Sequence, residues 1–201
     1  MAYRRTPAVQ ARQAATRERI LDATVELLDA GGWPAVTIAA VADHAGIATG
    51  TVYRYVDDKD ALCVETFRRT AGGEAHLVAE VARSEGPAVA RIAEGLRLFA
   101  ARALRRPRLA SALLADPCAP AVEAERIAHR RLHRDAIVSA LDDGVAAGEL
   151  EPHDSTLVAA ALVGAMAEAL VGPLSVARAH ERADEVTDEL VSTCLRALPA
   201  R

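Results

Sequence analysis

The chain has 201 residues, of which 51% are hydrophobic and 26% charged, so it carries enough apolar mass to form a folded core. This composition excludes a disordered chain and a fibrous one. Aromatic residues make up only 3%, and alanine dominates the apolar content, which favours helices over strands. We therefore expect an all-α protein.

The formal net charge of -4 hides a basic segment at the N-terminus. Residues 1–20 contain one glutamate and five arginines, a local net charge of +4: Arg4, Arg5, Arg12, Arg17 and Arg19. Such a segment is either a solvated, disordered start or an arm that contacts nucleic-acid phosphates. The sequence leaves both readings open.

The cysteines and the apolar stretches indicate a cytoplasmic protein. Cys63, Cys118 and Cys194 are too widely spaced for a disulfide framework or a zinc cluster, which favours a reducing compartment. The N-terminus shows no secretory signal pattern. The apolar stretch 157–174 is rich in alanine and glycine and ends in Gly-Pro, so we expect a buried helix there and no membrane span.

Hydrophobic periodicity predicts three helices in the first part of the chain. The first covers residues 16–30 and ends at Gly31-Gly32. Two very short helices follow at 38–44 and 49–55, with a four-residue turn between them. Helices this short are not stable alone and must be held by packing.

The rest of the chain reads as a larger helical unit. A helix is expected from the acidic cluster at 57–60 to about residue 83, since carboxylates stabilise a helix N-terminus. Further helices are expected to begin near 87, 107, 120, 155 and 182, each after a proline or a capping side chain. The predicted domains are residues 1–56 and 57–201.

Residues 37–55 have the layout of a helix-turn-helix. The small Ala42 lets two helices approach, and Gly46 can adopt the left-handed turn between them. The second helix leaves hydrogen-bonding side chains and no carboxylate for its outer surface: Thr49, Thr51, Tyr53, Arg54 and Tyr55. A carboxylate there would be repelled by the phosphates that flank a DNA major groove, so this composition favours double-stranded DNA as a partner.

Two further residues extend this predicted surface. Gly50 removes a side chain where the helix backbone would come closest to a duplex. Lys59, the only lysine of the chain, stands in the first turn of the next helix, where it can meet a phosphate or form a local salt bridge with neighbouring aspartates.

The head sequence resembles the DNA-binding domain of the tetracycline-repressor (TetR) family. The residues that carry the resemblance are Ile20-Leu21-Asp22-Ala23, Leu27-Leu28-Asp29-Ala30-Gly31-Gly32, Thr37-Ile38, Val41-Ala42, Ala45-Gly46-Ile47, Gly50-Thr51-Val52-Tyr53-Arg54-Tyr55 and Asp58-Lys59-Asp60-Ala61-Leu62. The resemblance implies a three-helix N-terminal helix-turn-helix domain joined to a larger helical ligand-binding and dimerisation domain. By position it assigns DNA contacts to Thr37, Thr49, Gly50, Thr51, Tyr53, Arg54, Tyr55 and Lys59.

Two positions depart from the family pattern. Ala48 stands where the family often has a serine cap, which puts one phosphate contact in doubt. Val56 stands where an aromatic residue is usual, which affects only local packing.

The resemblance implies an effector pocket between the helices of residues 60–175. Only Phe67 and Phe99 are aromatic in that stretch, so an aromatic cage for a flat cation is disfavoured and an aliphatic or mixed ligand is favoured. The candidate lining residues are Leu96, Phe99, Ala103, Leu114 and Met166, although residues of this kind are more often ordinary core positions.

A homodimer interface of two helices from each subunit is also implied. The first helix would offer the small residues Ala161, Gly164, Ala165 and Ala169, and the last helix Val186, Leu190, Val191, Cys194, Leu195 and Leu198. The alternative is that these positions form an ordinary internal core.

Glu125, His129 and His133 follow one another at i+4 steps, which could present three metal ligands. Four arginines flank them, and cations oppose metal binding, so a solvated charged face is the favoured reading. We expect no metal and no cofactor.

The sequence thus predicts a non-catalytic transcriptional repressor that binds a palindromic DNA operator as a homodimer and is released by a small-molecule effector. An activator or a ligand-independent regulator of the same fold remains open. A metal-assisted hydrolase and a purely structural helical protein are the remaining alternatives.

Overall fold

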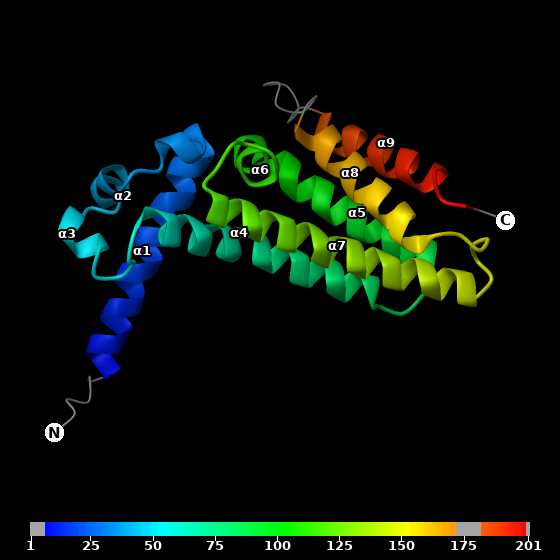
Figure 1. Ribbon diagram of the computed structural model, residues 1–201, viewed down its shortest axis with the longest axis horizontal. Helices are drawn as coiled ribbons and strands as arrows, with labels where there is room; N and C mark the ends of the chain where they lie inside the picture. Colours follow the sequence, from blue (N-terminus) through cyan, green and yellow to red (C-terminus); the bar gives the residue numbers. More distant parts are fainter. Residues whose placement is uncertain (1–6, 172–181, 200–201) are drawn as a thin grey trace.

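The computed structural model describes residues 7–171 and 182–199, and its elements are all helices (Figure 1). The head comprises α1 (Pro7–Gly31), the 3₁₀ turn η1 (Trp33–Ala35), α2 (Ile38–His44) and α3 (Thr49–Val52). The body comprises α4 (Lys59–Ala82), α5 (Ala88–Arg105), α6 (Pro107–Leu114), α7 (Pro120–Ala146), α8 (Ser155–Val171) and α9 (Ala183–Arg196). The all-α prediction is confirmed, and α2 and α3 lie at the end of the molecule away from α9.

The first helix begins nine residues earlier than predicted, at Pro7 instead of residue 16. Its added turns are mostly exposed, so they show no apolar periodicity, although their alanines, glutamines and single arginine are good helix formers. The predicted end at the glycine pair is correct. Gly32 has φ 69°, and its N–H donates to the carbonyl of Leu28 at 2.8 Å, which closes the helix.

The third helix is shorter than predicted, because it ends at Val52 instead of residue 55. Beyond it the backbone tightens: the N–H of Arg54 donates to Thr51 O and that of Tyr55 to Val52 O. The chain turns there toward Asp58, whose carboxylate accepts the N–H of Ala61 at 2.7 Å and caps α4.

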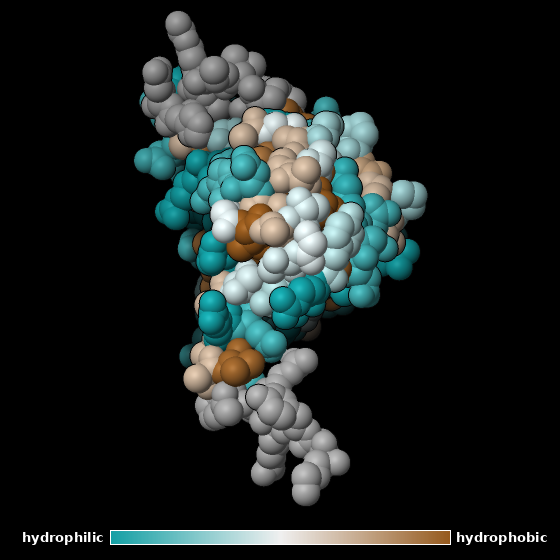
Figure 2. Space-filling view, turned by 90° about the vertical axis from the view of Figure 1, so that its left-hand side faces the viewer, coloured by the Kyte–Doolittle hydropathy of each residue, from teal (hydrophilic) through white to brown (hydrophobic). Residues whose placement is uncertain are grey.

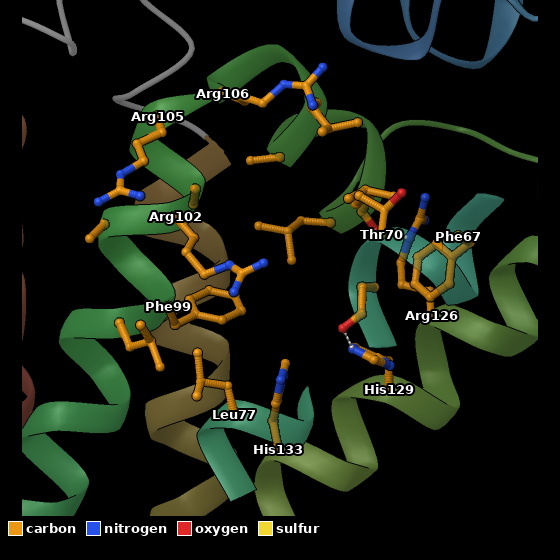
Figure 3. A pocket seen from close by; sticks show the side chains of 18 of the residues that line it. Phe67, Thr70, Leu77, Phe99, Arg102, Arg105, Arg106, Arg126, His129 and His133 are labelled. Atoms are coloured by element: carbon orange, nitrogen blue, oxygen red, sulfur yellow. Dashed lines mark hydrogen bonds between the residues drawn. The ribbon is translucent and has the colours of Figure 1, made fainter. Parts of the chain in front are cut away.

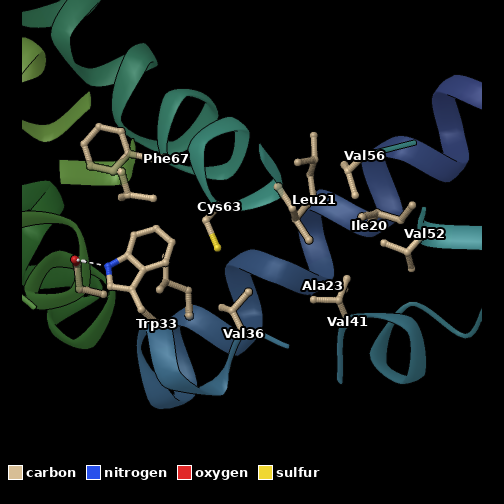
Figure 4. Packing of buried hydrophobic residues seen from close by; sticks show 14 of the residues in the cluster. Ile20, Leu21, Ala23, Trp33, Val36, Val41, Val52, Val56, Cys63 and Phe67 are labelled. Carbon is tan, nitrogen blue, oxygen red and sulfur yellow. Dashed lines mark hydrogen bonds between the residues drawn. The ribbon is translucent and has the colours of Figure 1, made fainter. Parts of the chain in front are cut away.

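The hydrophobic core of the head continues into the body. Trp33, Val36 and Val41 of the head share one cluster with Phe67 of α4 and Ala112 of α6 (Figure 4). The indole N–H of Trp33 donates to the carbonyl of Ala112 at 2.8 Å. A second cluster fills the space between α5, α7, α8 and α9.

The apolar residues predicted to place α9 in a dimer interface pack inside the subunit instead. Val191, Cys194 and Leu198 are buried in the second cluster, where α9 packs against α5 of the same chain. Val186, Leu190 and Leu195 are partly buried against that cluster, and the exposed side of α9 is polar and largely acidic. These six positions therefore serve the internal core, since their side chains point inward.

The small residues of α8 behave differently from the apolar residues of α9. Ala161, Gly164 and Ala165 are exposed, and Ala169 is partly buried. Leu157, at the start of the same helix, is 68% exposed. An uncovered face of small residues and one leucine therefore runs along α8.

None of the helices in the described ranges is both long and apolar enough to cross a membrane. Within the predicted apolar stretch, residues 157–171 belong to α8, and the remaining three lie outside the described residues.

Candidate functional sites

The α2–turn–α3 unit is fixed by local caps and by two fully buried valines. Thr37 caps α2, because its hydroxyl accepts the N–H of Ala40 at 3.1 Å. Gly46 has φ 63°, the left-handed conformation predicted for the turn. Val41 and Val52 pack between the helices, and the Arg19 guanidinium donates to the carbonyl of Ala45 in the turn.

Six of the eight predicted DNA contacts are exposed on this end of the molecule: Thr37, Thr49, Gly50, Tyr53, Arg54 and Lys59. Thr51 and Tyr55 are only half-exposed, and Tyr55 packs against the head core. The prediction that both lie on the outer surface is therefore wrong in part, since the turn after Val52 directs Tyr55 back toward the core. Ala48 makes no side-chain cap on α3, as its methyl group requires.

The exposed surface of α3 and of the turn after it carries hydrogen-bonding side chains and no carboxylate. Figure 2 views this end of the molecule and shows mostly pale side chains in the middle with hydrophilic ones around them. A Cβ built on Gly50 would meet no atom within 4 Å, so the backbone is open to a partner there. Lys59 is exposed and has no ion pair to another described residue, so the local salt bridge considered for it is not formed.

Only part of the predicted basic arm is available to a partner. Arg17 pairs with Glu65 at 2.6 Å, and this contact raises the pKa of Arg17. Arg19 is bonded to the helix-turn-helix as described above, whereas Arg12 is exposed on α1. Arg4 and Arg5 lie outside the described residues.

The extension of α1 forms a hollow beside the α3 turn that the sequence did not predict. Its lining residues are Gln13, Ala14, Arg17, Arg54 and Tyr55. Of the donors around it, the exposed guanidinium of Arg54 is suited to a phosphate, whereas Arg17 is paired with Glu65. The hollow was not predicted, because the hydrophobic periodicity placed the start of the first helix at residue 16, after Gln13 and Ala14.

A cavity of about 600 Å³ lies in the body between α4, α5, α6 and α7 (Figure 3). Its volume is in the range of sites for small organic ligands. Phe67 and Leu77 line it from α4, Phe99 and Arg102 from α5, and His133 from α7. The α6 side is apolar: Leu109, Ala110, Leu113 and Leu114.

The five predicted effector residues fall into two neighbouring spaces. Phe99, Ala103 and Leu114 line the large cavity, whereas Leu96 and Met166 line a second space of only about 40 Å³. Leu96 and Met166 are 5% and 2% exposed and belong to the second core cluster. The residues missed by sequence reasoning include Arg102, His129 and His133, which line the large cavity.

The two histidines face inward instead of forming the expected solvated face. His129 donates from Nε2 to the carbonyl of Ala71 at 2.7 Å, and its ring lies edge-on to that of His133 at 5.1 Å. Burial lowers the pKa of His133 to about 4 and that of His129 below its usual value, so both are neutral at pH 7.

The third residue of the i+4 series does not join the histidines. Glu125 accepts a hydrogen bond from Arg68 at 2.6 Å, and that contact lowers the pKa of the Glu125 carboxyl. In the described ranges no group of three acidic, histidine or cysteine side chains is placed to hold a metal ion.

Helix α6 lies between the cavity and the head. On the head side, Asp29 of α1 accepts the N–H of Leu109 at 3.0 Å and the Nε–H of Arg106 at 2.8 Å. Arg126 of α7, which is buried, donates to the carbonyls of Leu113, Ala112 and Asp116. The helix that lines the cavity is therefore bonded to both the head and α7.

Comparison with known proteins gives sequence matches that cover about a quarter of the chain. Residues 20–66 match the family described as bacterial regulatory proteins, tetR family. The HTH-type transcriptional repressor KstR of Mycobacterium tuberculosis is 47% identical over 57 residues, which are 28% of this chain and 26% of that protein. The HTH-type transcriptional regulator BetI of Burkholderia cenocepacia is 44% identical over 52 residues, 26% of this chain and 27% of that protein. The match spans about a quarter of the length of these relatives.

Solved structures share the fold over nearly the whole chain. FadR from Bacillus subtilis in complex with stearoyl-CoA has a TM-score of 0.72 at 19% identity, covering 87% of this chain and 97% of that chain. A TetR transcription regulator from Haloarcula marismortui has a TM-score of 0.76 at 22% identity, covering 92% and 98%. Residues 20–66 therefore carry the sequence pattern of the tetR family of bacterial regulatory proteins, and nearly the whole chain shares its fold with solved regulators of this kind.

Proposed function

We propose that the protein is a transcriptional repressor that binds a palindromic DNA operator as a homodimer and leaves it when a small molecule fills the body cavity. The single observation that carries the proposal is the exposed, carboxylate-free surface of α3 and the turn after it, within a head that matches the tetR family. The repressor KstR, a relative over the head, supports the direction of regulation. The protein is proposed to act by binding alone, without catalysis.

The geometry of the head supports entry of α3 into a major groove. Thr49, Gly50 and Tyr53 present two hydrogen-bonding groups and an open backbone to base edges. Arg54, in the hollow beside α1, and Lys59, at the start of α4, are placed to contact phosphates. The positive ends of short helices add to the attraction for phosphate.

The proposed dimer forms through the uncovered face of α8. Small side chains allow two helix backbones to approach closely, and an exposed leucine gains by burial. The face consists of Leu157, Ala160, Ala161, Gly164 and Ala165. A two-fold axis through this face would present two heads to the two halves of a palindrome.

Release is proposed to pass through α6. A ligand in the cavity contacts α6 on one side, and Asp29 and Trp33 hold α6 to the head on the other. A shift of α6 therefore moves α1, and with it the distance between the two heads of the dimer. The ligand would then bind the DNA-free arrangement of the dimer more tightly than the DNA-bound one. Release from DNA requires such a difference in affinity.

The DNA-binding proposal is tested by footprinting the purified protein on the intergenic DNA upstream of its own gene. We expect a protected palindrome whose protection weakens steeply with salt. Tyr53→Ala should abolish protection at moderate salt, and Lys59→Ala should lower the slope of log affinity against log salt by about 1. Arg83→Ala removes a cation at the far end of α4 and should change neither. Equal affinity of all four proteins would contradict the proposal.

The dimer is tested by sedimentation of Gly164→Arg. A Cβ at Gly164 meets no atom within 4 Å, so the substitution leaves the subunit fold intact while placing a charge in the proposed interface. We expect a monomer that protects no operator. Gly73→Arg, at an equally open position on α4, should remain a dimer, and a dimeric Gly164→Arg would reject this interface.

The role of α6 is tested by Asp29→Asn, which removes the charge paired with Arg106 and keeps the size of the side chain. We expect normal operator binding with weakened release by any compound that releases the wild type. Asp22→Asn breaks a comparable pair between α1 and Arg69 of α4 and should leave release unchanged. If a compound released both variants from the operator equally well, the proposed role of α6 in release would be wrong.

A further inference from the structure

The charged residues of the large cavity lie where it opens to solvent. Five arginines line it, and four of them are exposed: Arg102, Arg105, Arg106 and Arg130. The fifth, Arg126, is buried, and its guanidinium donates to Glu123 and to three backbone carbonyls. Water and protein groups therefore stabilise these charges, and the interior of the cavity does not require a charged ligand.

The interior presents a chain of four rings from three helices. Phe67 of α4, His129 and His133 of α7, and Phe99 of α5 all line the cavity (Figure 3). In this order each ring packs edge-on against the next, at centroid distances of 5.7, 5.1 and 5.4 Å. Burial lowers the pKa of both imidazoles, so at pH 7 they are neutral aromatic rings. The two phenylalanines seen in the sequence are thus extended into a continuous aromatic wall.

This wall favours an aromatic ligand over a saturated one of the same size. Ring contacts stabilise an aromatic molecule in addition to the burial of its apolar surface. The remaining apolar lining is aliphatic, with Leu109 and Leu113 from α6 and Leu77 from α4. These side chains can cover the rest of a flat molecule without competing for its polar groups.

His133 supplies a second, independent observation. Its side chain is nine-tenths buried and points into the cavity (Figure 3), and its Nε2 atom has no hydrogen-bond partner among the described residues. The neighbouring polar groups are engaged, since the Thr70 hydroxyl donates to the Thr66 carbonyl at 2.8 Å and His129 donates to the Ala71 carbonyl. A buried polar group without a partner is costly, so a ligand group that bonds to this imidazole would be stabilised.

A hydroxyl group suits this imidazole. One nitrogen of a neutral imidazole donates and the other accepts, and a hydroxyl group can form either bond. A half-turn about the Cβ–Cγ bond exchanges nitrogen and carbon atoms of the ring with little change of shape. The packing of Phe99 and His129 against His133 is therefore compatible with a nitrogen on the side of the cavity.

We propose that the ligand of this cavity is an uncharged aromatic alcohol, whose ring packs against the aromatic wall and whose hydroxyl group bonds to the imidazole of His133. The aliphatic side chains of α6 cover the rest of its surface. A cationic ligand is disfavoured, because none of the described lining residues is acidic. This names the chemical class of the effector and rests on the proposed function only for the step from binding to release.

The ligand class is tested by calorimetric titration of the DNA-free protein with four probes of similar size: 2-naphthol, naphthalene, decahydro-2-naphthol and 2-naphthoate, each below its solubility limit. We expect 2-naphthol to bind most tightly at pH 7. Naphthalene lacks the hydroxyl group and decahydro-2-naphthol lacks the aromatic rings, so each should bind about five-fold more weakly. 2-Naphthoate should also bind more weakly than 2-naphthol, because its carboxylate would lose water beside uncharged rings.

The roles of the residues are tested with the same probes. His133→Phe keeps an aromatic ring against Phe99 and should bind 2-naphthol and naphthalene with nearly equal affinity. Its binding of naphthalene shows that the variant is folded. Phe99→Leu removes one ring of the wall and should reduce the preference for 2-naphthol over decahydro-2-naphthol. His76→Phe, at an exposed histidine of α4 outside the cavity, is the matched control and should leave both preferences unchanged.

The inference is overturned if the four probes bind equally, if none binds, if 2-naphthoate binds most tightly, or if His133→Phe behaves like His76→Phe. It fails alone when the operator is protected but 2-naphthol is not preferred. The proposed function fails alone when 2-naphthol binds with the expected preferences but the protein protects no DNA. The two failures are separable because the titrations contain no DNA.

Discussion

The head and the cavity use hydrogen-bonding side chains in opposite ways. The head presents Thr49, Tyr53 and Arg54 to solvent and buries only apolar residues between its short helices. The cavity holds polar groups inside the body, where His133 is nine-tenths buried among aromatic and aliphatic side chains. The exposed groups of the head can contact a binding partner directly, whereas burial of His133 in the cavity couples its protonation to the stability of the fold.

The largest expected effect tests whether the two regions are energetically separate. Leu62 is fully buried on α4, in the cluster that joins head and body. Leu62→Ala should lower the free energy of unfolding by about 2–5 kcal/mol in a single cooperative urea transition followed by circular dichroism. Leu132→Ala, at a position 57% exposed on α7, should cost far less. Two separate transitions would show that the shared cluster does not couple the regions.

The next effect distinguishes the buried polar group of the cavity from the exposed ones of the head. His133 has a pKa of about 4 in the folded protein, against 6.5 for an unperturbed histidine, so the unfolded chain takes up its proton first. Stability is therefore full above pH 6.5 and is lost as the pH falls toward 4. Between pH 7 and pH 5 the loss should be about 2 kcal/mol in urea titrations. His133→Phe should flatten this dependence, and an unchanged slope would contradict it.

A smaller effect concerns a head residue with a local structural role. Thr37 caps α2 and is also a predicted DNA contact. Thr37→Ala should cost about 1 kcal/mol of stability, because an N–H of the first turn loses its acceptor. Thr37→Ser keeps the hydroxyl and should restore the stability. If the serine variant were as unstable as the alanine variant, the cap would not be the cause.

The smallest expected effect on stability has the opposite sign. Gly50→Ala should stabilise the head by about 0.5–1 kcal/mol, because glycine is a poor helix former and the added methyl meets no atom within 4 Å. Operator affinity in footprints should fall, since the methyl stands where the backbone is proposed to approach DNA. Gly73→Ala offers the same open environment on α4 and should stabilise without weakening DNA binding. If the operator affinity of Gly50→Ala were unchanged, Gly50 would not lie in the DNA interface.

Local sequence patterns were sufficient for most of the head. The helix-turn-helix layout and the left-handed turn at Gly46 were predicted correctly, because both depend on residues close to one another in the chain. The exposed start of α1 was missed because a solvated helix carries no apolar period. The turn that half-buries Tyr55 was missed because short helices end where tertiary packing, and not propensity, ends them.

The cavity could not be predicted in the same way. Its lining comes from four helices, and the distance between Phe67 and His133 along the chain carries no periodic signal. The i+4 spacing correctly placed His129 and His133 on one face of α7. The neighbouring arginines suggested that this face is solvated, whereas Arg131 is exposed on another side of the helix. Which face of a helix turns inward depends on the partners that pack against it.

Trp33 stands where the head meets α6, with its indole N–H bonded to the Ala112 carbonyl and its ring 6% exposed. It is the only tryptophan of the chain. The near-ultraviolet fluorescence of the protein beyond the tyrosine band therefore originates at this junction alone. Any event that loosens α6 from the head would expose the indole to water and shift its emission to longer wavelengths. The fluorescence of Trp33 can therefore report the proposed movement of α6 that accompanies ligand binding.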